Sequence, residues 1–156
     1  MPPEQKKKLG ELLMAKNLIS QEQLDAALQE QVRSKEFLGL ILIKRGALKE
    51  RDLTRALSEQ FHLPVIVLKD RFIDWEFLKD FDSDLIVDHK CFPVSGDDWS
   101  VTFAITNPLD VWAIEKAEQQ SRGLKVKLVL ASISDMDEVI ARYQEHMRRN
   151  ISDMFS

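Results

Sequence analysis

The feature that most constrains the fold is an internal repeat in the first 60 residues. Residues 7–31 read KKLGELLMAKNLISQEQLDAALQEQ, and residues 36–60 read EFLGLILIKRGALKERDLTRALSEQ. With this offset, the identical pairs are Leu9/Leu38, Gly10/Gly39, Leu13/Leu42, Leu24/Leu53, Ala27/Ala56, Leu28/Leu57, Glu30/Glu59 and Gln31/Gln60. Because a solenoid needs about three or more copies, two copies predict a pseudo-symmetric helical pair instead.

Each copy predicts a short helix, a tight break and a longer helix. Leu9, Leu12 and Leu13 follow the i, i+3, i+4 spacing of one buried helical face. Asn17 and Gly46 occupy the same place after the short helix of each copy, and both residue types easily adopt the left-handed backbone that ends a helix. The N-terminal region should therefore contain four helices.

The longer helices differ in how they begin. Ser20 with Gln23 three residues later predicts a capping box, whereas Lys49 replaces the serine in the second copy and predicts a weaker cap. The inner face of the first long helix is expected to consist of Leu24, Ala27, Leu28 and Gln31.

The rest of the chain predicts strands mixed with helices. The expected strands are 63–68 (LPVIVL), a hairpin of CFPVS and 99–106 around the Gly-Asp-Asp turn at 96–98, and the stretch LKVKLVLAS. Short helices are expected in DWEFLKDF and DLIVDH. Longer helices are expected at 107–123, with Asn107 near the N-cap, and from near Ser134 onward. The predicted class is α+β, with a helical subdomain at 1–61, an α/β subdomain at 62–146 and a polar tail at 147–156.

Composition excludes several classes of protein. A net charge of −4 and a pI near 5.4 argue against a DNA- or RNA-binding protein that relies on a basic surface. Cys91 is the single cysteine, which excludes an internal disulfide and fits a reducing compartment. No secretory signal or run of about 20 apolar residues is visible. The expected location is the cytoplasm, or the cytoplasmic side of the inner membrane as a peripheral protein.

The repeat resembles the MshEN domain, the N-terminal domain of type II secretion and type IV pilus assembly ATPases. The resemblance rests on two Leu-Gly…Leu-x-x-Ala-Leu-x-x-Gln motifs in register and on the downstream stretch from FPVSGDDW to IARY, which together cover about Lys7 to Tyr143. It implies a non-enzymatic bacterial receptor for cyclic di-GMP that relays binding to a secretion, pilus or motility machine through a protein partner.

The resemblance implies that each repeat holds one half of the dinucleotide. The candidate ligand-binding residues are Lys8, Leu9, Gly10, Leu24, Leu28, Gln31, Phe37, Leu38, Gly39, Leu53, Leu57, Gln60 and Asn107. Glycine permits close approach of helix-start amides to phosphate, leucine offers apolar contact to the base and ribose, and the glutamine carboxamide can donate and accept hydrogen bonds.

Three positions depart from the family pattern. An arginine typically precedes Leu-Gly in cyclic di-GMP binders, but this chain has Lys8 and Phe37 there, and Asn107 replaces an aspartate. Lysine keeps the charge without the planar guanidinium, and phenylalanine can stack on a base without neutralising phosphate.

Plainer interpretations stay open beside this one. A leucine stripe at helical spacing is usually core, and a glycine in a helix often marks close packing. The alternative function is a protein–protein adaptor with a degenerate nucleotide site, and a further alternative is a fragment of a longer ATPase.

Other candidate sites carry weaker signals. The string Arg71 to Asp74 matches an Arg-x-x-Asp motif that occurs often by accident. Asp80, Asp82 and Asp84 have EF-hand ligand spacing, but Leu85 and Cys91 stand where glycine and glutamate are needed. The histidines lack zinc-site spacing, and no G-x-x-x-x-G-K-[ST] phosphate loop is present. We therefore expect no metal, no cofactor and no ATP hydrolysis.

Overall fold

The computed structural model describes residues 3–155, and the side chains of residues 9–155. The chain divides into two compact units. The first extends up to Val65 and includes the distant segment Asn107–Val111, and the second comprises Ile66–Thr106 and the chain from Trp112 on. Helices of the first unit precede a three-stranded mixed sheet with its own helices, so the predicted α+β class is confirmed.

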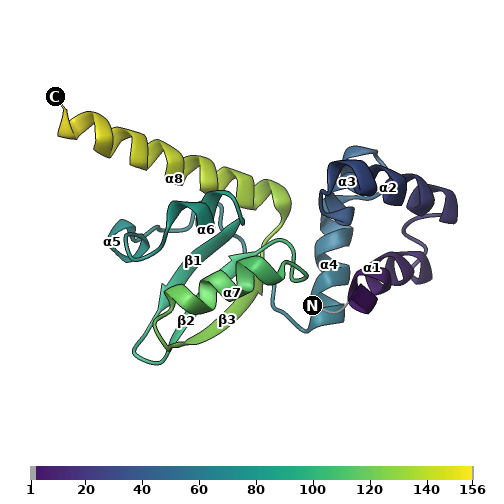
Figure 1. Cartoon of the computed structure of the whole chain (residues 1–156), viewed down its shortest axis with the longest axis horizontal. Coiled ribbons are helices and arrows are strands. Elements are labelled where there is room, and N and C mark those ends of the chain that lie inside the picture. Colours follow the sequence, from purple (N-terminus) through teal and green to yellow (C-terminus); the bar gives the residue numbers. More distant parts are fainter. Residues whose placement is uncertain (1–2, 156) are drawn as a thin grey trace. The chain divides into compact units, whose positions relative to one another are not determined.

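Four helices form the first unit, as the repeat predicts (Figure 1). They are α1 (Pro3–Ala15), α2 (Gln21–Ser34), α3 (Leu38–Lys44) and α4 (Glu50–Phe61). Helix α1 packs against α4, and α2 packs against α3. Each short helix therefore lies on the long helix of the other copy, so neither copy buries its apolar face alone.

The two copies break their short helices with the same backbone geometry. Asn17 has φ = 59° and Gly46 has φ = 75°, so both adopt the predicted left-handed conformation. Three backbone hydrogen bonds close the break in each copy, at 2.9–3.0 Å. In the first copy the donors are the N–H groups of Lys16, Asn17 and Leu18, and the acceptors are the carbonyls of Leu12, Met14 and Leu13, respectively. In the second copy the N–H groups of Arg45, Gly46 and Ala47 donate in the same way to the carbonyls of Ile41, Ile43 and Leu42. The repeat in sequence is thus a repeat in hydrogen bonding.

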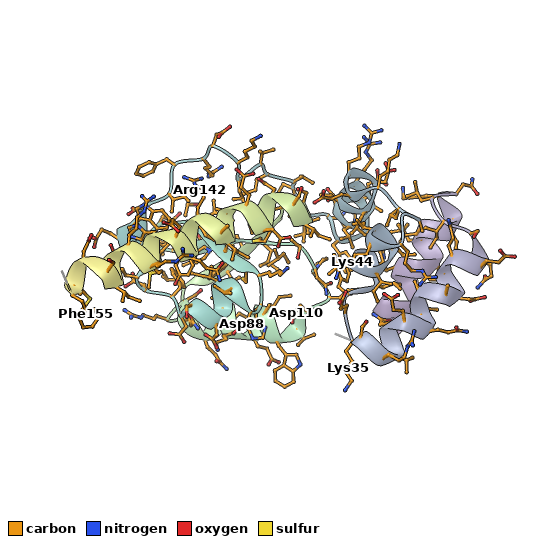
Figure 2. All side chains as sticks on the ribbon, turned by 90° about the horizontal axis from the view of Figure 1, so that it is seen from above. Lys35, Lys44, Asp88, Asp110, Arg142 and Phe155 are labelled. Atoms are coloured by element: carbon orange, nitrogen blue, oxygen red, sulfur yellow. The ribbon has the colours of Figure 1, made fainter. Side chains whose placement is uncertain are left out.

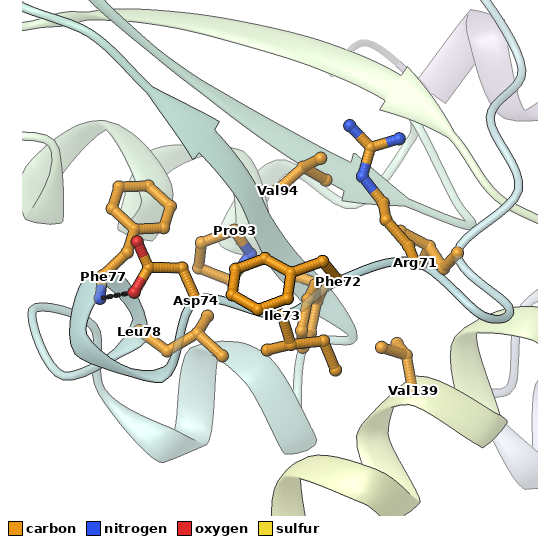
Figure 3. Close-up of a pocket in the computed structure, with 11 residues that line it drawn as sticks. Arg71, Phe72, Ile73, Asp74, Phe77, Leu78, Pro93, Val94 and Val139 are labelled. Carbon is orange, nitrogen blue, oxygen red and sulfur yellow. Dashed lines mark hydrogen bonds between the residues drawn. The ribbon is translucent and has the colours of Figure 1, made fainter.

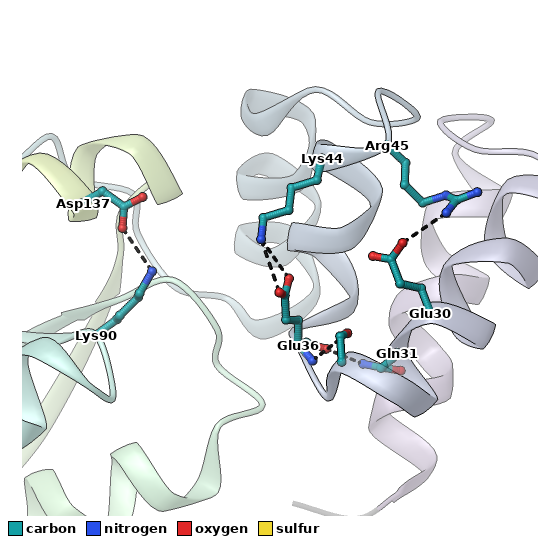
Figure 4. Close-up of polar contacts among 8 residues, drawn as sticks. Glu30, Gln31, Glu36, Lys44, Arg45, Lys90 and Asp137 are labelled. Atoms are coloured by element: carbon teal, nitrogen blue, oxygen red, sulfur yellow. Dashed lines mark hydrogen bonds and ion pairs between the residues drawn. The ribbon is translucent and has the colours of Figure 1, made fainter.

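Two ion pairs connect the copies reciprocally. Lys16 of the first copy pairs with Glu59 of the second. Arg45, the counterpart of Lys16, pairs with Glu30, the counterpart of Glu59, at 3.1 Å (Figure 4). Such an exchange is what a two-fold-related interface produces, since residue i of one half meets residue j of the other in both directions. The pair of repeats is therefore pseudo-symmetric.

The capping predictions are also confirmed. The Ser20 hydroxyl accepts from the Gln23 backbone N–H at 3.2 Å, and the Gln23 side chain accepts from the Ser20 N–H at 2.9 Å. Lys49 makes no side-chain cap to α4. One part of the α2 prediction is wrong, because Leu28 is 41 % exposed while Leu24 and Ala27 are buried.

A mixed sheet is the centre of the second unit. Its strands β1 (Cys91–Gly96), β2 (Ser100–Ile105) and β3 (Lys125–Leu130) lie in that order. Strands β1 and β2 form the predicted antiparallel hairpin, and β2 pairs in parallel with β3 after a crossover through α7 (Val111–Gln120). The remaining helices are α5 (Trp75–Leu78), α6 (Ser83–Val87) and α8 (Ile133–Met154).

Two sequence predictions for this region are wrong. Residues 63–68 form no strand beyond an isolated bridge at Val65, because the boundary between the units falls inside this apolar run and leaves Val67 68 % exposed. Asn107 does not cap α7, which begins at Val111. The last helix begins at Ile133, as predicted near Ser134, with Ser132 as its N-cap, and it continues to Met154 through most of the polar tail.

None of the helices in the described part of the chain combines the length and hydropathy needed to cross a bilayer.

The close contacts at the two repeat glycines predict a graded response to alanine. A Cβ on Gly39 would lie 2.6 Å from Leu53 Cδ2 and 3.1 Å from a Phe37 ring carbon, whereas a Cβ on Gly10 would lie 2.9 Å from Leu24 Cδ1. Overpacking costs about 1–3 kcal/mol, and replacing a helical glycine recovers about 1 kcal/mol. We expect urea denaturation to show Gly39→Ala destabilised by about 1–2 kcal/mol and Gly10→Ala near neutral. The reverse order would contradict this packing.

The ion pair between the copies predicts a titration shift. The hydrogen bond and positive charge of Lys16 hold the pKa of the Glu59 carboxyl below its ordinary value. Because the folded pKa is the lower one, the pair stabilises the fold above the unfolded-state pKa, and this stabilisation is lost as pH falls through the folded pKa. In a carboxyl NMR titration, Lys16→Met should return the pKa of Glu59 towards its ordinary value. Arg45→Met is the matched control and should leave Glu59 unchanged.

Candidate functional site

The residues predicted to bind ligand fall within a single compact unit. Twelve of them come from the two repeats, and Asn107 joins them because the segment Asn107–Val111 belongs to the helical unit. The backbone of Lys8 lies in α1, but its side chain falls outside the described residues. Tertiary structure thus unites motifs that are about 50 residues apart in sequence.

The first repeat presents one apolar side chain from its predicted set. Leu9, Gly10 and Leu24 are buried, whereas Leu28 is 41 % exposed on α2. Val32, one helical turn further, is also exposed. Leu28 is therefore accessible to a ligand, and Val32 extends that surface although the sequence motif does not include it.

The second repeat is more closed. Leu38, Gly39, Leu53 and Leu57 are buried, and Leu57 is only 1 % exposed where its counterpart Leu28 is 41 % exposed. Phe37 is partly exposed in the extended N-cap position of α3. The two predicted half-sites consequently differ in what they offer, despite their common backbone.

The two motif glutamines are in different states. The Gln31 side-chain amide donates to the Glu36 carbonyl at 3.0 Å and stabilises the loop between α2 and α3 (Figure 4). Gln60 is exposed, and its side chain makes no hydrogen bond to another described residue. Glu36 was not identifiable from sequence as a partner, because it contributes a backbone atom that leaves no residue-type signal.

Asn107 organises a turn. Its side-chain oxygen accepts from the Leu109 N–H at 2.9 Å, and its carbonyl accepts from the Asp110 N–H at 3.2 Å. Pro108 and Leu109 are buried, which anchors this turn. The oxygen of Asn107 is thus committed to the backbone, as is typical of an Asx turn.

The glycines support packing more directly than phosphate contact. Gly10 lies inside α1 and not at a helix start, so the expectation of a free amide there is wrong. Gly39 is the second residue of α3, but its missing side chain is also what admits the Leu53 methyl groups. Both glycines let a long helix approach a short one, which positions the surrounding residues.

Among the described residues of the second unit, three groups have a shifted pKa, and none of them is a predicted site residue. Each shift has a structural cause. Backbone N–H groups of Trp99 and Ser100 donate to Asp97 at 2.7 and 2.8 Å and lower its pKa, which secures the hairpin turn. The pKa of Asp84 is lowered by its hydrogen bond with Lys116. Burial raises the pKa of the Tyr143 hydroxyl.

The weaker motifs have structural roles. Asp82 exchanges hydrogen bonds with Gln120, and Asp84 pairs with Lys116, so the EF-hand-like spacing serves α6 instead of a cation. Asp74 of the Arg-x-x-Asp string caps α5 through the Phe77 N–H at 3.2 Å. Within residues 9–155, no three His, Cys, Asp or Glu side chains gather as metal ligands would.

Comparison with known proteins extends these observations. The MshEN domain family model matches residues 61–150. A solved structure of MshE with cdg, that is, cyclic di-GMP, superposes with a TM-score of 0.72 at 27 % identity and covers 86 % of this chain and 97 % of that chain. The N-terminal domain of XpsE has the same fold at 22 % identity, with a TM-score of 0.71 and coverage of 87 % and 93 %. The structural superposition covers 86 % of this chain, which is more than residues 61–150 alone. The likeness to MshE therefore includes part of the helical repeats.

Among curated proteins, the type IV pilus assembly ATPase PilB of Myxococcus xanthus is 32 % identical over 147 residues. PilB of Thermus thermophilus is 53 % identical over 53 residues. The chain spans 26 % and 6 % of the lengths of these two relatives. Because the family model covers more than half of the residues and the fold matches that of MshE, the chain belongs to the MshEN domain family.

Proposed function

We propose that the helical unit binds cyclic di-GMP, with one repeat facing each guanosine half. The observation that carries this proposal is the reciprocal arrangement of the repeats. The ion pair Lys16–Glu59 runs from the first copy to the second, and the equivalent pair Arg45–Glu30 runs from the second copy to the first. Cyclic di-GMP consists of two identical nucleotides in a ring, so a receptor with two equivalent halves can offer the same groups twice. The likeness to the structure of MshE with cdg supports the choice of ligand.

The exposed motif residues are the ones that can reach a ligand directly. Leu28 offers apolar surface in the first repeat, and Gln60 has an uncommitted carboxamide in the second. Phe37 is partly exposed and can stack on a base. Seven further motif residues are buried, so their proposed role is to hold the helices that carry these contacts: Leu9, Gly10, Leu24, Leu38, Gly39, Leu53 and Leu57.

The phosphates require donors, and the chain offers two kinds. Lys8 carries the positive charge expected before the first Leu-Gly, as a compact ammonium instead of a guanidinium fork. Asn107 keeps its side-chain nitrogen available while its oxygen serves the turn.

The proposed role is regulatory. Ligand binding would be relayed to a protein partner in a secretion, pilus or motility machine, on the cytoplasmic side of the membrane. Similarity to PilB supports this class of machine, while the chain itself contains no phosphate loop for ATP hydrolysis.

A second candidate is an adaptor in which the nucleotide site is degenerate. It is favoured by the internal use of Gln31, whose side-chain amide donates to the Glu36 carbonyl. In that case the repeat serves packing alone, and the domain acts through its surface.

Isothermal titration with cyclic di-GMP tests the site. We expect wild-type binding in the micromolar range and a loss of about tenfold for Gln60→Ala, since one hydrogen bond to a charged or polar ligand group contributes about 1–2 kcal/mol. Leu28→Ser should weaken binding similarly through lost apolar contact. Gln29→Ala, at an exposed position on the same helix, is the matched control and should bind as wild type. Absence of heat at high micromolar ligand would favour the adaptor.

Stability measurements separate ligand contact from scaffolding. Gln31→Ala should lower the free energy of unfolding by about 1 kcal/mol, because it leaves the partly buried Glu36 carbonyl unpaired. Gln60→Ala should leave the free energy of unfolding unchanged, since Gln60 has no partner among the described residues. Urea denaturation without ligand provides both values, and equal effects would overturn the distinction between the glutamines.

A further inference from the structure

A shallow apolar cavity lies beside β1 in the second unit, away from the motifs discussed above. Its walls include Leu68, Ile73, Phe77, Pro93, Val94 and Val139 (Figure 3). These side chains come from the loop before α5, from α5 itself, from β1 and from α8. The cavity therefore joins four segments that also form the core of this unit.

Two arginines lie at or beside the rim of the cavity. Arg71 lines it, and Arg142 of α8 donates from Nη1 to the Arg71 carbonyl at 3.4 Å. Figure 2 shows Arg142 projecting outward from α8. Neither guanidinium forms an ion pair with any of the residues described, so both retain their charge for another molecule.

Several acidic groups lie near this rim: Asp74 also lines the cavity, Asp70 precedes Arg71, and Glu138 lies one helical turn before Arg142 on α8. Asp74 accepts from the Phe77 N–H at 3.2 Å. Asp135 accepts from the Leu68 and Lys69 N–H groups at 2.5 and 2.8 Å. Asp74 and Asp135 therefore secure the backbone around the cavity, and among the described residues no carboxylate, Asp70 and Glu138 included, forms an ion pair with Arg71 or Arg142.

An aromatic ring stands at the mouth of the cavity. Phe72 is 87 % exposed, the largest exposed fraction of any large hydrophobic side chain in the described part of the chain. It lies between Arg71 and the buried Ile73, over Pro93 (Figure 3). Covering a solvent-exposed aromatic side chain beside an apolar cavity with a partner is favourable, because apolar surface is removed from water.

The adjacent strand edge is unsuited to backbone pairing. Pro93 has no N–H to donate, and the register of β1 shifts between Pro93 and Ser95. A partner at this place must therefore be recognised through its side chains and not by adding a strand.

We propose that this cavity, with Phe72 and the two arginines, docks a short segment of a partner protein that carries a bulky aliphatic side chain flanked by carboxylates. The aliphatic group covers Phe72 and the cavity walls. The carboxylates meet Arg71 and Arg142, whose guanidinium groups form paired hydrogen bonds with carboxylates. The surface lies wholly within the second unit, and none of its residues belongs to the repeats.

The test is a selection of random twelve-residue peptides displayed on phage, against the full wild-type chain. Enriched peptides should share an aliphatic residue next to two or more acidic residues. Their affinity, measured by fluorescence anisotropy with labelled synthetic copies, should fall at least tenfold for Arg71→Glu with Phe72→Ser. It should also fall several-fold between 50 and 200 mM salt, because exposed charges are screened at that ionic strength. Arg51→Glu, on α4, is the matched control and should bind as wild type.

Chemical-shift mapping with the same peptides locates the contact. Perturbations should cluster at residues 71–78, 93–94 and 139–142. The proposal is overturned by a lack of enrichment over the double variant, by selection of basic peptides, or by perturbations elsewhere. It is also overturned if sedimentation shows a wild-type dimer that the double variant loses, since a second copy then covers the cavity.

Discussion

The close approach of a short helix to a long helix within each repeat is the contact on which the helical unit depends. At Gly39 the space of a Cβ is taken by the Leu53 methyl groups, and at Gly10 by those of Leu24. This approach lets the break after each short helix form the same hydrogen bonds in both copies. It also leaves the outer surface of each short helix to pack against the other copy, since a short amphipathic helix is marginal until its apolar face is covered. Leu-Gly is thus first a packing signal, and any ligand site is built on that packing.

The two repeats are equivalent in their backbone turns and ion pairs, but they differ in the exposure and hydrogen bonding of the predicted ligand-binding side chains. The turns and the reciprocal ion pairs are equivalent between the copies. Leu28 and Leu57 are identical in type yet differ in exposure, and Gln31 is bonded internally while Gln60 is free among described residues. A change at Leu57 would disturb the core, whereas a change at Leu28 alters only a surface. Leu28 can therefore vary with little effect on folding.

The parts of the fold that local chemistry controls were predictable. Ser20 with Gln23, Asn17 and Gly46, and the Gly-Asp-Asp hairpin each act within a few residues, and the structure contains all of them. The prediction for 63–68 failed because strand propensity says nothing about where a unit boundary falls or which strand edge is available. Leu28 was wrongly placed inside because helical spacing gives the direction of a side chain without saying whether another element covers it.

By itself, the sequence determined that two copies of one helical unit exist, where each helix breaks, and that a mixed α/β region follows. These features depend on residue type and spacing over a few turns of chain. Only the tertiary structure decided that Asn107 joins the helical unit, that Leu57 is covered while Leu28 is not, and that Arg71 and Phe72 border a cavity with Val139. Such outcomes depend on which distant segments meet, and burial is a property of those meetings, so identical residues in identical motifs reach different environments.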